Sequence, residues 1–367
     1  MERQIKQCFS TDITKMFGIK HPVVLAGMNV AAGPELAAAV TNAGGLGVIG
    51  GLNYTPKMLR MMIRDLKSGL NDPSAPFGVD LLLPKVGEGA RKTNYDYTKG
   101  KLDGLIDVII EEKTKLFVSA VGVPPKYIID KLHNNGILVM NMVGAPKHAR
   151  KAIELGVDII CAQGSEGGGH TGDIGTAVLI PAIVDICRPH RIPVLAAGGI
   201  YDGRGLAMAL CMGASGVWVG TRFVASTEAS APPVHKDAIL KTQHHETFRT
   251  LVFTGRPLRI GPNEYAHDWE TKRSNKMKKL LSEGTVPSDY DQEMLEKGTF
   301  DEEDIECLMK YADKPRPYPH LMGQVAGSIQ EVKPAKVILE DMVISASLIL
   351  NKVTSMRTNI HSLHAKL

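Results

Sequence analysis

The chain has 367 residues, of which 44% are hydrophobic and 22% charged, values near the globular average that exclude wholesale disorder. Its formal net charge of +4 comes from interleaved basic and acidic residues, so we expect no nucleic acid partner. No segment approaches about 18 continuous apolar residues and the five cysteines show no CxxC spacing, which favours a protein of a reducing compartment that neither spans a membrane nor is secreted.

Along the chain, short apolar runs alternate with segments of helical spacing. The predicted strands cover residues 22–28, 46–50, 77–83, 116–122, 137–144, 158–164, 193–199 and 216–223. The predicted helices between them cover residues 34–42, 57–66, 125–133, 146–155, 177–187 and 203–212.

Eight strand–helix units with nearly continuous apolar strands predict a (β/α)8 TIM barrel of the α/β class. A doubly wound open sheet is the alternative. It usually carries a GxGxxG turn after its first strand, and the segment after Met28 reads Asn-Val-Ala-Ala-Gly-Pro-Glu. We therefore prefer the barrel.

Two segments interrupt the repeat. One is an insertion at residues 84–100, and the other begins beyond Ser226. We expect the barrel to occupy residues 1–230 and a charged, helix-rich excursion to occupy residues 231–321, as a lid or an oligomer surface. An apolar helical pattern at residues 322–351 then predicts that residues 322–367 pack back on the barrel and complete it.

A glycine-rich run follows the sixth predicted strand and presents one histidine, in the sequence CAQGSEGGGHTG. Glycines let the backbone approach a planar ligand closely, and His170 supplies a group that titrates near neutral pH. In a barrel the active site lies at the carboxyl ends of the strands. The run is therefore a candidate active-site loop, although glycines also mark turns without chemistry.

The seventh and eighth predicted strands end in Gly198-Gly199 and Gly220-Thr221. Loops at these two places are the usual phosphate site of a barrel, because glycines expose backbone N–H groups there. The pair of motifs predicts a ligand that carries a phosphate.

Together these pieces resemble the nitronate monooxygenase family, formerly called 2-nitropropane dioxygenases. The segments AGMNVAAGPELAAAVTNAGGLGVIG, PFGVDLLLP, CAQGSEGGGHTG, VLAAGGI and VWVGTRF stand in the family's order and spacing, and the resemblance continues through TGRPLRI, the region of Tyr265 to Trp269, and Gly323-Gln324. It covers nearly the whole chain and implies an FMN-dependent oxidoreductase that converts alkyl nitronates and O2 into carbonyl compounds and nitrite.

The resemblance also implies roles for individual residues. His170 is the implied catalytic base, which takes the proton next to a nitro group or holds the nitronate oxygens. The implied cofactor-binding residues are Gly27 and Met28 beside the flavin ring, Asp80, Gln163 and Gly168 along the cofactor, and Gly198, Gly199, Val219, Gly220 and Thr221 around the phosphate.

Asp80 departs from the family, since many relatives have asparagine at this position. An ionised carboxylate would repel a reduced flavin, so Asp80 must be protonated, paired or turned away, and Arg91 and Lys92 are candidate partners. Glu166 either positions His170 or caps the loop, and we favour the cap.

Three other functions compete. A flavin reductase that uses NADH or NADPH is the strongest alternative, because flavin-dependent enoyl-acyl carrier protein reductases and some quinone reductases resemble the same barrel and share a Gly-Gly-His loop. A dehydrogenase of the inosine-monophosphate type needs a nucleophilic cysteine on the loop after the sixth strand, and Cys161 lies within that strand. A barrel that only binds or scaffolds is the third alternative.

The chain ends in Ala365-Lys366-Leu367, a close relative of the peroxisomal Ser-Lys-Leu address. In a eukaryotic source we expect recognition by the peroxisomal import receptor; in a bacterium the tripeptide would carry no such meaning and the protein would be cytoplasmic.

Overall fold

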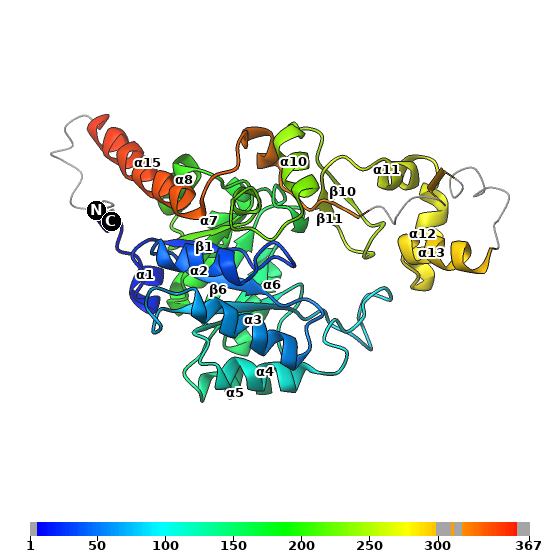
Figure 1. Cartoon of the computed structure of the whole chain (residues 1–367), viewed down its shortest axis with the longest axis horizontal. Coiled ribbons are helices and arrows are strands. Elements are labelled where there is room, and N and C mark those ends of the chain that lie inside the picture. Colours follow the sequence, from blue (N-terminus) through cyan, green and yellow to red (C-terminus); the bar gives the residue numbers. More distant parts are fainter. Residues whose placement is uncertain (1–5, 299–309, 312–317, 358–367) are drawn as a thin grey trace.

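In a computed structural model that describes residues 6–298, 310–311 and 318–357, eight parallel strands form a barrel surrounded by helices (Figure 1). Neighbouring strands follow the order β1-β9-β8-β6-β5-β4-β3-β2, and a bridge between Val24 and Leu46 joins the two ends of this row. The predicted TIM barrel is confirmed. The strands are β1 (Val23–Leu25), β2 (Gly47–Gly50), β3 (Phe77–Leu82), β4 (Leu116–Ala120), β5 (Leu138–Val143), β6 (Ile159–Gln163), β8 (Val194–Ala197) and β9 (Gly216–Val219).

Alternate strand residues serve two separate cores, as the period of two in a strand requires. Val24, Val118 and Trp218 belong to a cluster inside the barrel, whereas Val23 and Val217 belong to a larger cluster that includes the surrounding helices. The short helix α1 (Asp12–Phe17) contributes its own apolar residues to the inner cluster. The barrel is thus a packed core at the level of the strands, and ligands must lie at its rim.

In the described part of the chain, seven α-helices lie between successive strands of the barrel, and six of them match predicted ones to within two residues. The seventh, α4, was not predicted, although Leu105, Ile106 and Ile109 form its buried face at helical spacing. The covering helices are α2 (Pro34–Asn42), α3 (Pro56–Ser68), α4 (Leu102–Glu111), α5 (Lys126–His133), α6 (Pro146–Leu155), α7 (Thr176–Cys187) and α8 (Gly203–Cys211).

After the eighth barrel strand, the chain turns at once into α9 (Thr221–Val224), so the predicted strand at residues 216–223 is too long. The excursion contains the expected helices but also two short strands that the sequence analysis did not predict. Its elements are α10 (Pro233–Lys241), β10 (Phe248–Thr250), β11 (Leu258–Ile260), α11 (Glu264–Thr271), α12 (Ser274–Glu283) and α13 (Pro287–Lys297).

The chain then returns to the barrel. The helical pattern predicted from residue 322 becomes a short 3-10 helix, η2 (Gln324–Ser328), and the long helix α15 (Ala335–Ser355), which starts directly after Pro334. Figure 1 shows α15 beside α8, at the opposite end of the molecule from α11, α12 and α13. A Cβ on Gly203 would lie 2.5 Å from the backbone nitrogen of Ala346, so the two helices are in very close contact.

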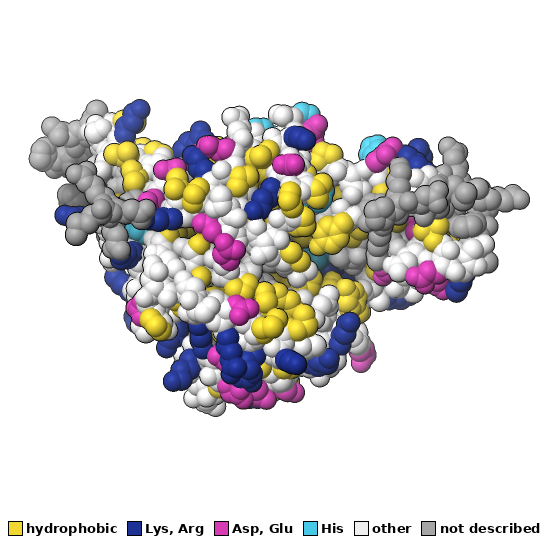
Figure 2. Space-filling view, viewed as in Figure 1, with side chains coloured by type: hydrophobic (Ala, Val, Ile, Leu, Met, Phe, Trp, Pro, Cys, Tyr) yellow, Lys and Arg dark blue, Asp and Glu magenta, His cyan; other side chains and the backbone are white. Residues whose placement is uncertain are grey.

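On the face shown in Figure 2, basic and acidic side chains are mixed, and they form no continuous basic patch. Among the described residues, no helix combines the length and the apolar character needed to cross a membrane. The terminal tripeptide Ala365-Lys366-Leu367 lies outside the described residues.

A buried ion pair holds the helices of the excursion together. The Asp291 carboxylate accepts hydrogen bonds from Tyr265 Oη (2.7 Å), Trp269 Nε1 (2.8 Å), and Arg273 Nη1 (2.9 Å) and Nη2 (2.8 Å). The Arg273 guanidinium also lies 3.5 Å from the centre of the Trp269 ring. All of these groups are buried, so the charges depend on one another for stabilisation.

We predict that Asp291→Asn destabilises the protein by about 3–5 kcal/mol, because the substitution removes the buried carboxylate that pairs with the Arg273 charge. Urea denaturation measures this loss. The control is Glu293→Gln, which removes an exposed ion pair with Lys297 and should cost less than about 1 kcal/mol. Equal effects of the two substitutions would contradict the prediction.

Candidate active site

His170 is held in place by the excursion. The two-residue strand β7 (Gly169–His170) pairs with β11, which places His170 opposite Leu258, and β11 pairs in turn with β10. His170 Nε2 lies 3.0 Å from Thr254 Oγ1. Gly169 has a φ of +75°, a conformation that favours glycine. The loop therefore delivers its histidine in one fixed orientation.

Burial and the nearby charge of Arg256 lower the pKa of His170 to about 4. Removal from water disfavours the imidazolium, and a second positive charge disfavours it further. At neutral pH the ring is therefore uncharged, with one nitrogen able to accept a proton and the other able to donate a hydrogen bond.

Asp80 lies in β3, two residues before the strand ends at Leu82. Only 2% of its surface is exposed. A Cβ on Gly27 would lie 2.3 Å from the Cβ of Asp80, so a glycine at position 27 makes room for the aspartate. The two residues predicted for the same ligand are thus in contact.

The predicted partners of Asp80 are wrong. Arg91 Nη1 donates to the carbonyl oxygen of Gly255 (3.1 Å), and Lys92 Nζ donates to that of Ser282 (2.7 Å). Asp80 Oδ1 is buried without a hydrogen-bond partner among the described residues. Burial raises the pKa of Asp80 well above its usual range. Of the three alternatives that the sequence left open, the structure supports the protonated acid.

The glycine pair after β8 adopts the conformations that a close turn requires, with φ of +91° for Gly198 and +71° for Gly199. A Cβ on Gly198 would lie 2.8 Å from the Gly164 carbonyl oxygen, so no larger residue fits. Positive φ at two successive glycines leaves backbone N–H groups free to point at an anion.

The end of β9 lies next to the end of β1. A Cβ on Gly220 would lie 3.5 Å from Met28 Sδ. Met28, which is predicted to lie by the flavin ring, is therefore next to Gly220, which is predicted to bind the phosphate. Thr221 Oγ1 accepts a hydrogen bond from the Gly323 N–H (2.9 Å), so the hydroxyl proton can still be donated to a ligand. Val219 is the last residue of β9 and is fully buried.

Gln163 and Gly168 meet within the histidine loop. Gln163 Nε2 donates to the Gly168 carbonyl oxygen at 3.3 Å. A Cβ on Gly168 would lie 2.7 Å from the backbone carbon of Met322, so this glycine permits close passage of the chain that returns from the excursion. That packing is a sufficient structural reason for glycine at position 168.

Glu166 has the structural role that we favoured. Its carboxylate accepts hydrogen bonds from the Thr176 backbone N–H at 2.9 and 3.0 Å and from the Thr176 hydroxyl at 2.9 Å. It thereby caps the start of α7. Both carboxylate oxygens of Glu166 are therefore already hydrogen-bonded to Thr176.

Residues from outside the barrel strands also approach His170. Thr254, from the excursion, contacts its ring, and the charge of Arg256 acts on it. Arg256 Nε in turn donates to Asn94 Oδ1 at 2.9 Å, which links the excursion to the insertion at residues 84–100. The segment TGRPLRI had been noticed only as a family motif, and no local pattern in it indicates a neighbour of His170.

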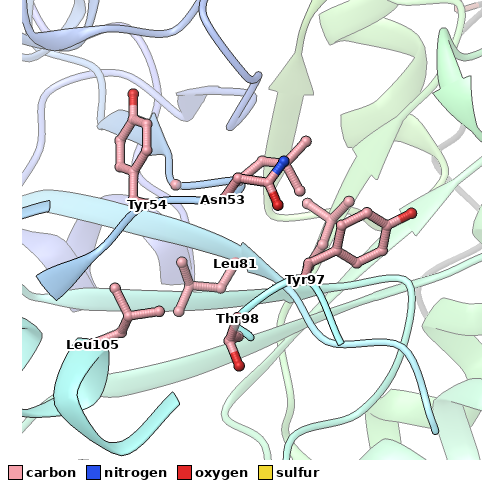
Figure 3. Close-up of a pocket in the computed structure, with 9 residues that line it drawn as sticks. Asn53, Tyr54, Leu81, Tyr97, Thr98 and Leu105 are labelled. Atoms are coloured by element: carbon pink, nitrogen blue, oxygen red, sulfur yellow. The ribbon is translucent and has the colours of Figure 1, made fainter. Parts of the chain in front are cut away.

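The insertion also covers the rim beside β3. In Figure 3, Tyr97 and Thr98 from the insertion lie near Leu81 of β3, with Asn53 and Tyr54 on the neighbouring loop. Tyr97 is buried there. The insertion therefore packs against the barrel at the end of β3.

Comparisons with known proteins agree with this geometry. The family model "Nitronate monooxygenase" matches residues 10–345. A candidate monooxygenase of Mycobacterium tuberculosis is 31% identical over 350 residues, which cover 84% of this chain and 90% of the relative. Another protein of that organism, a dehydrogenase of a hydroxy-methyl-oxo-octahydroindene carboxyl-CoA, is 36% identical over 261 residues, 71% of this chain and 68% of the relative.

Solved structures add the same fold. FabK from Thermotoga maritima superposes with a TM-score of 0.74 and 33% identity, over 95% of this chain and 100% of that chain. Nitroalkane oxidase from Streptomyces ansochromogenes superposes with a TM-score of 0.75 and 25% identity, over 93% of this chain and 99% of that chain. The matches together establish an oxidoreductase, and the family implies a flavin cofactor.

We predict that the His170 ring titrates at a pH of about 4. NMR of the imidazole protons measures the midpoint, and His170→Ala identifies the signal by removing it. The sign follows from the lowered pKa: the folded protein binds the proton less tightly than the unfolded chain, so His170 has no effect on stability above pH 6.5 and destabilises the folded state progressively as the pH falls from 6.5 to about 4. A midpoint near 6.5 would contradict the buried environment.

We predict that Asp80→Asn stabilises the protein increasingly as the pH rises above about 4, because burial raises the pKa of Asp80 in the folded protein. The folded state keeps Asp80 protonated while the unfolded state ionises it, so folding of the native sequence loses up to about 1.4 kcal/mol per pH unit in this range. Urea denaturation at several pH values, with both proteins in the same cofactor state, measures the difference. A difference that does not change with pH would show that Asp80 is ionised in the folded protein.

Proposed function

Because the chain belongs to the nitronate monooxygenase family, we propose that it oxidises alkyl nitronates with FMN and O2, giving a carbonyl compound and nitrite. The observation that carries the proposal is the position of His170, an uncharged and oriented imidazole at the glycine-lined rim of the barrel. The FMN cofactor and the role of each residue are part of this proposal.

The residues at the rim fit an FMN molecule. Gly198, Gly199, Gly220 and Thr221 offer backbone N–H groups and one hydroxyl, as a phosphate needs, and Val219 leads into that turn. Gly27 and Met28 would lie by the flavin ring, with Gln163 and Gly168 on the histidine side. Bound flavin would supply the electron acceptor, and the protein would orient it.

His170 has two uses in this chemistry. Because Nε2 lies 3.0 Å from Thr254 Oγ1, Nδ1 would face the substrate. Without a proton, Nδ1 takes a proton from the carbon next to the nitro group; with a proton, it holds an oxygen of the nitronate. Taking the proton needs the neutral ring, which burial and Arg256 maintain.

Asp80 also suits an electron-rich cofactor when it is protonated. A neutral carboxylic acid can donate a hydrogen bond, as the amide of asparagine does in many relatives. Its buried, unpaired Oδ1 is a polar atom that bound FMN would satisfy. The proposal therefore assigns Asp80 to cofactor binding.

A second function follows from the CoA-linked relative, which is 36% identical. A carbon next to a thioester is acidic for the same reason as a carbon next to a nitro group, so the same imidazole could serve a CoA thioester dehydrogenase. The third function is the NADH- or NADPH-dependent flavin reductase named above. The peroxisomal address remains a prediction, and the relatives described above are bacterial.

The test is the absorbance spectrum of the purified protein under anaerobic conditions. Addition of an alkyl nitronate should change the flavin bands, and addition of NADH or NADPH should leave them unchanged. Bleaching by a nicotinamide alone would make the protein a reductase. A protein without flavin that cannot be reconstituted with FMN would contradict the proposal.

We predict that His170→Ala lowers the rate of nitroalkane oxidation by at least about 100-fold, the usual contribution of a positioned base. Steady-state oxygen consumption measures the rate. His190→Ala is the matched control, because His190 is exposed at the end of the 3-10 helix η1 (Arg188–His190), and it should retain the full rate. A normal rate for His170→Ala would exclude His170 as the base.

A further inference from the structure

Val121 has a backbone conformation that a valine rarely adopts. Its φ is +71°, and among the described residues only Val30 and Val121 combine a β-branched side chain with a positive φ. In this conformation the Cβ lies too close to the following carbonyl oxygen, and branching at Cβ adds to the strain. Such strain persists where the surrounding structure enforces it, and it is concentrated at functional sites.

Buried hydrogen bonds enforce the turn at Val121. The Gly122 carbonyl oxygen accepts hydrogen bonds from Asn141 Nδ2 (2.6 Å) and Ser119 Oγ (2.9 Å), and Asn141 Nδ2 also donates to the Ser119 carbonyl oxygen (3.0 Å). Ser119 and Asn141 are both buried. A Cβ on Gly122 would lie 2.1 Å from the Leu83 carbonyl oxygen, so the turn is also packed tightly against the end of β3. Val121 is therefore held in its conformation before any ligand binds.

The turn takes the Val121 side chain out of the hydrophobic core. In a regular strand, residue 121 would face the same side as Phe117, which packs in the cluster between the strands and the helices. Val121 is instead partly exposed and belongs to none of the hydrophobic clusters of the described residues, whereas Val123 packs against the outer cluster. Core packing thus gives no reason for a strained valine at position 121.

Val121 directly follows β4 at the carboxyl end of the barrel, where barrel ligands bind. Neighbouring strands run in the order β6-β5-β4-β3, with Asp80 in β3 and the His170 loop after β6. The loop after β5 contacts the histidine loop, because a Cβ on Gly172 would lie 2.4 Å from the Gly144 carbonyl oxygen. The ends of β4 and β5 therefore form the part of the rim between Asp80 and His170.

The predicted phosphate turns lie on the other side of the barrel. Gly220 and Thr221 follow β9, and β4 is the fourth strand from β9 in both directions around the closed barrel. A molecule that contacts Val121 thus reaches the rim on the side of Asp80 and His170, away from the proposed phosphate site.

We propose that Val121 is a specificity residue, which contacts the alkyl group on the carbon that His170 deprotonates and sets how long this group can be. A valine held in one conformation offers an apolar surface of fixed shape, and such a surface discriminates ligands by their size. The inference rests on the proposed function and names the residue that selects among its substrates.

The test compares the nitronates of nitroethane and 1-nitrohexane as substrates, with oxygen consumption as the measurement. Val121→Phe should lower kcat/KM for the longer nitronate by at least about tenfold, mainly through a higher KM, since a misfit of one small group in an apolar pocket costs about 10- to 200-fold. For the shorter nitronate, kcat/KM should stay within about threefold. Val121→Ala should shift the preference toward the longer nitronate.

Lys113→Gly is the matched control for backbone strain. Lys113 has a φ of +54° and is exposed just before the amino end of the same strand, β4. Lys113→Gly and Val121→Gly both relieve a strained φ and should raise the midpoint of urea denaturation. Only Val121→Gly should change the ratio of kcat/KM between the two nitronates.

Two results would overturn the inference while leaving the proposed function intact. One is an unchanged ratio of kcat/KM in all three variants of Val121. The other is a lower urea midpoint for Val121→Gly, which would show that the valine serves packing.

If the enzyme oxidises neither nitronate, the proposed function fails, and direct binding then decides the inference. Acetate and hexanoate, which carry a planar pair of oxygen atoms as nitronates do, are titrated into the purified protein by calorimetry. Val121→Phe should raise the Kd for hexanoate at least about tenfold and the Kd for acetate less than about threefold. Binding of neither to the native sequence, or equal changes for both, overturns the inference. A loss of FMN affinity in Val121→Phe also overturns it, because the valine would then contact the cofactor.

Discussion

The pairing of β7 with β11 is the constraint on which the site depends. Two residues of the histidine loop form this strand, and Leu258, 88 positions further along the chain, lies opposite His170. Without this pairing, a loop of three successive glycines would have no reason to hold one orientation. The excursion is thus a structural part of the candidate active site, because its strand β11 holds the histidine loop.

The rim combines groups whose charges are suppressed with the cation of Arg256, which forms no ion pair with any residue that the structure describes. Burial keeps Asp80 protonated and His170 unprotonated, so an acid and a base coexist there without forming an ion pair. Arg256 keeps its charge beside them. A site of this kind is suited to an anion, because the neutral groups can hydrogen-bond to it and the arginine attracts it.

The barrel was predictable because it depends on local periodicity. Short windows of sequence are enough to recognise the eight apolar runs and the glycines at positions 198, 199 and 220. In the structure the runs form the barrel strands, and the glycines directly follow the ends of β8 and β9. The helix α4 was equally legible and was overlooked beside the insertion. The strands β10 and β11 were not legible, because three residues are too few to show a period.

The neighbours of the site residues were harder to predict than the residues themselves. Arg91 was assigned to Asp80 on proximity in the sequence, yet it bonds to Gly255, 164 positions away. Thr254 and Arg256 reach His170 through long-range strand pairing that no local pattern records. The desolvation that sets both pKa values is likewise a property of the assembled rim.

The most direct test of the account is the anaerobic rate of flavin reduction in His170→Gln, measured with a neutral nitroalkane and with the nitronate prepared from it. The account predicts that reduction by the nitroalkane is lost, while the nitronate, which needs no base, still reduces the flavin. Full reduction by the nitroalkane would contradict the assignment of His170 as the base.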